Sequence, residues 1–257
     1  MASEQSGSRA VGQSGSPSFD YLVRLGDDRL VLGHRLSEWC GHGPILEEDI
    51  ALANIALDLI GQANLLLEQA GKAEGKGRDQ DALAYFREAT EYRNILMVEL
   101  EKGDFAFTIA RQFFFSVFNY LQMEALAKSS HADLAGIAAK AVKEAKYHVR
   151  HSADWVVKLG DGTAGSHKRM QQAVDDLWRF TGEMFIADVV DKEVFDPAAL
   201  EKPWRAHVDD VLKRATLTIP ETKYMQRGGR DGKHTEHLGH MLTEMQIVAR
   251  SFPDGKW

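Results

Sequence analysis

The 257-residue sequence contains no proline between Pro44 and Pro197. Proline removes a backbone donor and clashes with the preceding helical turn, so a stretch of this length without proline suits long helices. Ala, Leu, Glu and Lys, which are strong helix formers, dominate the same stretch, and no alternating pattern of useful length predicts a strand. The sequence therefore predicts an all-α protein.

Start and stop signals predict eight helices, with boundaries good to a few residues. They cover about residues 20–39, 47–70, 79–101, 104–128, 133–159, 166–194, 203–219 and 235–251. Short loops join four long helices in two pairs, which is typical of an antiparallel four-helix bundle with a crossover. We expect one helical domain over residues 19–257, because residues 1–18 are rich in Ser, Gly and Gln and predict a disordered tail.

The composition excludes several classes of protein. A formal net charge of −7 argues against nucleic acid or an anionic membrane as the main partner. No apolar run is long enough for a membrane span, and the N-terminus has no signal-peptide core. Cys40 is the single cysteine, which excludes an intrachain disulfide framework and fits a reducing compartment. We therefore expect a cytoplasmic protein.

The predicted helix over residues 47–70 is apolar on nearly every side, so we expect it to be buried. Asn54, Asp58 and Gln62 nevertheless recur every four residues and share one face, and Gly61 beside them would admit a neighbouring backbone. A buried carboxylate is costly unless it is paired or binds a cation. This face is either a hydrogen-bonded polar seam or a metal site or its remnant.

Two further polar residues lie among apolar ones. His148 falls on the apolar stripe of the helix over residues 133–159, but Ala145 stands where a Glu-x-x-His di-iron motif needs its carboxylate. Glu144 is turned away from that position by about 100°. Glu38, at the end of the first helix, is expected to form a salt bridge with a nearby Arg.

The most tempting metal-binding pattern is the C-terminal cluster of His234, His237 and His240 with Glu244. His237, His240 and Glu244 follow an i, i+3, i+7 spacing that could place them on one helix face. The pattern is not His-Glu-x-x-His, and we favour a polar interface or a capping role. The Gly-Gly-Arg stretch before the cluster lacks the spacing of a phosphate-binding loop.

Several long segments resemble one known family over nearly the whole chain after residue 18. The sequence resembles the PaaC family, which is the C component of the ring-1,2-phenylacetyl-CoA epoxidases. The segments that carry the resemblance are LGHRLSEWCGH (32–42), ALANIALDLIGQA (51–63), KEAKYH (143–148), LWRFT (177–181) and GGRDGKHTEHLG (228–239).

The resemblance implies a ferritin-like fold within a multicomponent monooxygenase that epoxidises the aromatic ring of phenylacetyl-CoA during aerobic phenylacetate degradation. It places the di-iron centre in PaaA, the related catalytic component. A separate reductase passes electrons from NADPH through FAD and an iron–sulfur centre. No cofactor is then expected in this chain. Its expected partners are PaaA and also PaaB, the B component. This chain is expected to form a homodimer or a heteromer. The resemblance thus implies a non-catalytic structural subunit.

The resemblance implies that most ligand positions of the catalytic relative correspond here to residues that bind iron poorly, namely Leu59, Gln62, Ser116 and Ala145. Only Glu38 and His148 match a ligand of the relative. About two donors of six cannot hold two irons, because Leu and Ala offer no lone pair and a neutral amide is a poor iron ligand. We expect no metal site, with Glu38, Asp58, Gln62 and His148 as candidates for a vestigial one. The alternatives are an altered metal site in this chain and an unrelated helical scaffold.

Overall fold

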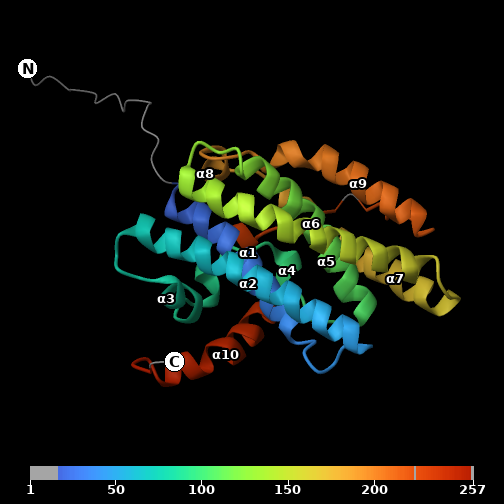
Figure 1. The fold of residues 1–257 in the computed structure, drawn as a ribbon, viewed down its shortest axis with the longest axis horizontal. Coiled ribbons are helices and arrows are strands. Elements are labelled where there is room, and N and C mark those ends of the chain that lie inside the picture. Colours follow the sequence, from blue (N-terminus) through green and yellow to red (C-terminus); the bar gives the residue numbers. More distant parts are fainter. Residues whose placement is uncertain (1–16, 223, 256–257) are drawn as a thin grey trace, which may run out of the picture.

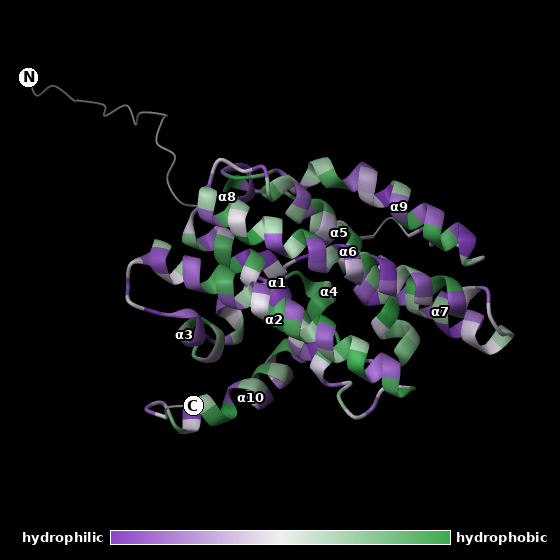
Figure 2. Cartoon of the chain, viewed as in Figure 1, coloured by the Kyte–Doolittle hydropathy of each residue, from purple (hydrophilic) through white to green (hydrophobic). Residues whose placement is uncertain are grey.

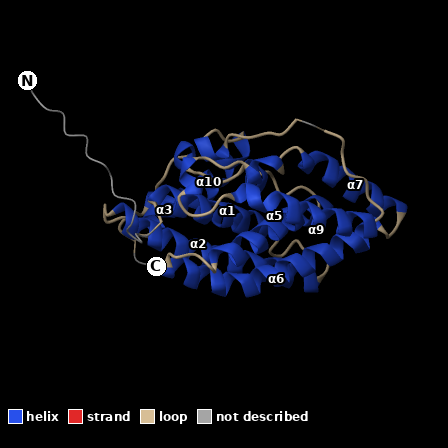
Figure 3. Cartoon of the chain, turned by 90° about the horizontal axis from the view of Figure 1, so that it is seen from above, coloured by secondary structure: helices blue, strands red, loops and turns tan. Residues whose placement is uncertain are grey.

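The computed structural model describes residues 17–222 and 224–255, and this part of the chain contains helices and no strand (Figures 1 and 3). The prediction of an all-α protein is confirmed. The α-helices are α1 (Phe19–Ser37), α2 (Leu46–Glu74), α3 (Gln80–Tyr85), α4 (Leu96–Glu99), α5 (Phe105–Leu126), α6 (Ala132–Gly160), α7 (Ala164–Trp178), α8 (Val189–Lys192), α9 (Glu201–Arg214) and α10 (Glu236–Ser251). The 3-10 turns are η1 (Ala89–Glu91), η2 (Gly182–Phe185), η3 (Pro197–Leu200) and η4 (Gly229–Asp231).

Most of the predicted tail, residues 1–16, lies outside the described residues. Ser18 belongs to the described part and caps α1, because its hydroxyl accepts a hydrogen bond from the backbone N–H of Tyr21. Asp104 caps α5 in the same way through the N–H of Phe107, as the sequence predicts.

Helices α1, α2, α5 and α6 form a four-helix bundle, and the remaining helices surround it (Figure 1). Gly26 lies against Leu67 and Gly33 against Ile60, so α1 and α2 run antiparallel at close range. Helix α7 packs against α5 and α6, α9 covers the same pair, and α10 contacts α3 and η1. The outlying helices α7, α9 and α10 carry both hydrophilic and hydrophobic residues (Figure 2).

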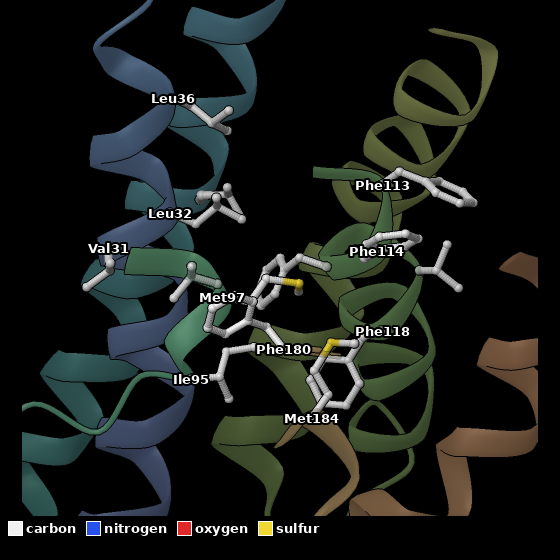
Figure 4. Close-up of a cluster of buried hydrophobic side chains, with 14 of the residues drawn as sticks. Val31, Leu32, Leu36, Ile95, Met97, Phe113, Phe114, Phe118, Phe180 and Met184 are labelled. Carbon is white, nitrogen blue, oxygen red and sulfur yellow. The ribbon is translucent and has the colours of Figure 1, made fainter. Parts of the chain in front are cut away.

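The hydrophobic core joins the bundle to the segments that cross it. Side chains from α1, from the α4 segment, from α5 and from the η2 segment meet in one cluster (Figure 4). Met97, Phe118, Phe180 and Met184 lie together at its centre, and all of them are nearly or fully buried. The short segments around residues 95–100 and 180–185 are therefore part of the core and not surface loops.

Two predicted helices are wrong. Residues 79–101 form α3, η1 and α4 in place of one helix, and residues 166–194 form α7, η2 and α8. In the second region Arg24 of α1 binds Asp188 and Asp191 at 2.6 and 2.9 Å, and Asp188 also caps α8. The carboxylates of Asp188 and Asp191 also accept from the backbone N–H groups of residues 188, 190 and 191, which a continuous helix would have bonded to its own carbonyls.

The prediction that α2 is buried is wrong for one side of the helix. Leu46, Ile50 and Leu57 are 72%, 53% and 66% exposed, and they lie on one side of the helix. By length and composition alone α2 is apolar enough to cross a membrane, contrary to our expectation, although half of its most apolar stretch is buried in the bundle. Leu46, Ile50 and Leu57 thus form an apolar strip on the outer face of α2 that no described residue covers.

Candidate functional site

The centre of the bundle holds a charged side chain among apolar neighbours. Arg29 of α1 is fully buried. Its Nη1 donates to the carbonyl oxygen of Leu25 at 2.7 Å, and its Nε donates to Oε1 of Gln62 on α2 at 3.2 Å. Its Nη2 donates to the amide oxygens of Asn119 and Gln122 on α5, the latter at 3.2 Å. One guanidinium group therefore joins three helices.

Gln62 extends these contacts to the fourth helix. Its Nε2 donates to Oε2 of Glu144 on α6 at 2.8 Å. The amide oxygen faces the guanidinium and the amide nitrogen faces the carboxylate, so the contacts fix the orientation of the side chain. The core polar network, defined as Arg29, Gln62, Asn119, Gln122 and Glu144, links all four bundle helices.

Arg29 keeps its proton in this setting. Burial lowers the pKa of Arg29 to about 10, and the negative charge of Asp28 opposes that shift. A pKa of about 10 leaves the guanidinium charged at neutral pH. The bundle centre therefore carries a permanent positive charge.

Asp58 and His148 pair one helical turn from Gln62. His148 is fully buried, and its Nε2 lies 3.0 Å from Oδ2 of Asp58, whose side chain is about one-third exposed. Asp58 and Gln62 both tie α2 to α6, as a hydrogen-bonded polar seam would. Asn54 is exposed and does not belong to the seam. Gly61 has no described atom within 4 Å of its Cβ position, so no backbone of the described chain approaches it there.

Glu38 lies apart from the other predicted site residues. Arg35 donates to Oε1 of Glu38 at 2.7 Å, which confirms the predicted salt bridge. Lys102 donates to the backbone oxygen of Glu38, at the C-terminal end of α1. The nearby Arg111 of α5 is fully buried and donates to the carbonyl oxygen of Glu101. The structure therefore brings together Asp58, Gln62 and His148 but not Glu38.

The C-terminal histidines do not share one site. His234 lies with Nδ1 2.7 Å from Oε2 of Glu99, while His237 is 3.5 Å from Glu101 and His240 is exposed. Burial lowers the pKa of His234, but the hydrogen bond and the charge of Glu99 together raise it by more than burial lowers it. The pKa of His234 therefore lies above its ordinary value. His234 serves as a structural link between α4 and the start of α10.

Buried acidic side chains of α1 hold the segment that we predicted as a helix. Asp27 and Asp28 are fully buried. Asp27 accepts from the backbone N–H of Arg93 at 2.8 Å, and Asp28 accepts from that of Ile95 at 2.9 Å. Asp28 also binds Arg230 of η4, with Nη2 2.7 Å from Oδ2. These carboxylates replace helical hydrogen bonds between residues 91 and 95.

Two more buried carboxylates attach the C-terminal loop. Glu183 accepts from the backbone N–H groups of Leu96 and Gly228 at 2.7 and 2.8 Å. Burial raises the pKa of Glu183, and these backbone hydrogen bonds oppose the rise. Glu99 is fully buried and accepts from the backbone N–H of Thr235. We call Asp27, Asp28, Glu99 and Glu183 the acidic clamp.

Comparison with known proteins establishes where the chain belongs. The family of phenylacetic acid catabolic proteins, PaaA and PaaC, matches residues 5–257. The chain is 47% identical over 243 residues to the C component of the 1,2-phenylacetyl-CoA epoxidase of Escherichia coli (strain K12), and the alignment covers 92% of this chain and 98% of that relative. The chain belongs to this family. The resemblance found in the sequence is confirmed, and the alternative of an unrelated scaffold is wrong.

The bundle interior does not fit the di-iron centre that the resemblance implies for the catalytic relative. Two irons need carboxylate and imidazole donors from all four helices. The bundle centre instead holds a guanidinium, which is a hydrogen-bond donor only, and neutral amides. The acidic and imidazole groups beside them are engaged elsewhere, because Glu144 accepts from Gln62 and His148 pairs with Asp58. The described residues also hold no group of three or more His, Cys, Asp or Glu placed to share one metal ion.

Arg29 and the acidic clamp were not predicted from the sequence. A signal was present in α1, where Asp27, Asp28 and Arg29 are consecutive and have apolar residues on both sides. Successive residues point about 100° apart on a helix, so three in a row cannot all face one solvated side of a buried helix. At least one buried charge could therefore have been predicted, although its partners could not.

Proposed function

We propose that this chain is a non-catalytic structural subunit of a multicomponent phenylacetyl-CoA epoxidase, in which it supports the catalytic component PaaA in aerobic phenylacetate degradation. The single observation that carries this proposal is the buried Arg29, whose guanidinium and amide partners stand at the bundle centre. A fixed positive charge there opposes binding of metal cations and offers them no ligand. The name of the E. coli relative supports a place in an epoxidase complex.

The proposed complex divides the chemistry among its chains. PaaA would hold the di-iron centre, the reductase would carry NADPH, FAD and an iron–sulfur centre, and PaaB would be a further partner. The exposed apolar face of α2, with Leu46, Ile50 and Leu57, is of the kind that a partner protein covers in a stable heteromer. We place the complex in the cytoplasm, where the single, exposed Cys40 stays reduced.

Metal analysis tests the proposal directly. We expect the purified chain to contain far less than one iron per molecule, and we expect co-expression with PaaA to yield a co-purifying complex whose iron belongs to PaaA. The physical reason is that the groups bonded to Arg29 are neutral oxygens, with Glu144 as the one carboxylate of the core polar network. Elemental analysis and optical spectra of both preparations measure the outcome. Stoichiometric iron with an oxo-bridged spectrum in the isolated chain would contradict the proposal.

His148→Ala tests the alternative of an altered metal site in this chain. We expect the assembled complex to keep its epoxidation rate within about twofold, because His148 pairs with Asp58 as part of a structural seam. Size-exclusion chromatography checks assembly, and turnover of phenylacetyl-CoA by the complex is measured. The matched control is His151→Ala, which removes the neighbouring pair with Glu48 at 2.8 Å. Loss of turnover specific to His148→Ala, with assembly intact, would give this residue a chemical role.

A further inference from the structure

In the part of the chain that the structure describes, all hydrogen-bond partners of the Arg29 guanidinium are neutral oxygens. They are the backbone oxygen of Leu25 and the amide oxygens of Gln62, Asn119 and Gln122. A buried Arg ordinarily pairs with a carboxylate, because removing an ion from water is costly. The adjacent Asp28 instead accepts hydrogen bonds from Arg230 and from the backbone N–H of Ile95. Within residues 17–222 and 224–255, the cation is therefore held at hydrogen-bond distance by neutral dipoles alone.

These oxygens form a receptor of definite shape. They come from α1, α2 and α5, and they meet all three nitrogens of the guanidinium. Glu144 of α6 accepts a hydrogen bond from Nε2 of Gln62 and so holds the Oε1 atom of the same amide in place. Such a set of acceptors matches the fork of donors that guanidinium presents, and a compact ammonium ion cannot reach them all.

We propose that the bundle centre is a guanidinium-binding site that the protein fills with its own Arg29. The fixed cation holds α1, α2 and α5 together, and truncation of the side chain leaves a site for free guanidinium ion. This inference goes beyond the proposed function, because it depends only on contacts within this chain. It holds or fails whether or not the chain assembles with an epoxidase.

Thermal unfolding of the full-length Arg29→Ala variant tests the site. We expect Tm to fall by about 5 °C, because the amide oxygens lose their donors. Millimolar guanidinium chloride, far below denaturing concentrations, should then restore part of the loss, whereas equal sodium chloride should not. The matched control is Arg29→Met, whose side chain fills the same space without donors, so that guanidinium should restore nothing. Equal responses of both variants to guanidinium would overturn the proposal.

A second pair of variants tests the charge without emptying the site. The Nδ2 of Asn119 is buried and has no partner among the described residues, while its Oδ1 accepts from Arg29. Asn119→Asp would place a second acceptor beside the cation and remove the unpaired donor, so we expect Tm to stay level or rise. Asn119→Leu should lower Tm by several degrees. An equal decrease in both variants would show that no positive charge faces this position, and the proposal would fail.

Discussion

Substitution of Arg230 by Met is expected to lower the free energy of unfolding by about 3–5 kcal/mol. Arg230 donates to both carboxylate oxygens of Asp28, at 3.0 and 2.7 Å, and to the backbone oxygen of Arg93 at 2.6 Å. Asp28 is fully buried, so the variant leaves a carboxylate whose remaining hydrogen-bond donor among the described residues is the N–H of Ile95. Urea unfolding of the full chain measures the change.

Two controls show whether the loss comes from the unpaired charge. Arg205→Met removes an exposed pair with Asp209 and is expected to change stability by less than about 0.5 kcal/mol. Adding Asp28→Asn to Arg230→Met neutralises the buried carboxylate and should recover part of the loss. If Arg230→Met lowers the free energy of unfolding no more than Arg205→Met does, Arg230 does not stabilise the fold through Asp28.

The long helices of the bundle could be predicted because their signals are local. Helix α5 begins after the capping residue Asp104, and α6 ends at Gly160, within one residue of the prediction. The apolar spacing of these segments is regular over several turns, and proline is absent from all of them. Neither property depends on any distant part of the chain.

The broken segments could not be predicted because their hydrogen-bond partners are distant in sequence. The N–H groups of Arg93, Ile95 and Leu96 donate to carboxylates that lie 66, 67 and 87 positions away. Helix propensity carries no information about such partners. Residues 79–101 contain good helix formers, yet the acidic clamp outcompetes the helix for their backbone groups.

Only part of the candidate site could be predicted, because the rest depends on contacts between residues that are distant in sequence. The four-residue spacing of Asp58 and Gln62 predicts a shared helix face, and the structure places both against α6. The identity of the group facing Gln62 depends on how α1 packs against α2, which periodicity does not determine. Arg29 was therefore missed, while Glu38 was grouped with residues that the structure keeps apart from it.

Gly229→Ala is expected to lower the free energy of unfolding by about 3 kcal/mol or more. A Cβ at this position would lie 2.0 Å from the carbonyl oxygen of Asn94, a backbone atom that cannot move away as a side chain could. The N–H of Gly229 also donates to Glu183 at 2.9 Å, so the loop cannot shift without weakening the acidic clamp. Thermal and urea unfolding of the full chain measure the effect.

The matched control is Gly136→Ala, an exposed helical position in α6 whose Cβ would meet no described atom within 4 Å. The free energy of unfolding of that variant should rise by up to about 1 kcal/mol, because alanine favours the helix more than glycine does. Opposite signs for one chemical change would show that the Gly-Gly-Arg segment serves close packing against residues 94–95. Equal effects would mean that the C-terminal loop does not lie against Asn94, and the pairing of Arg230 with Asp28 would then fail with it.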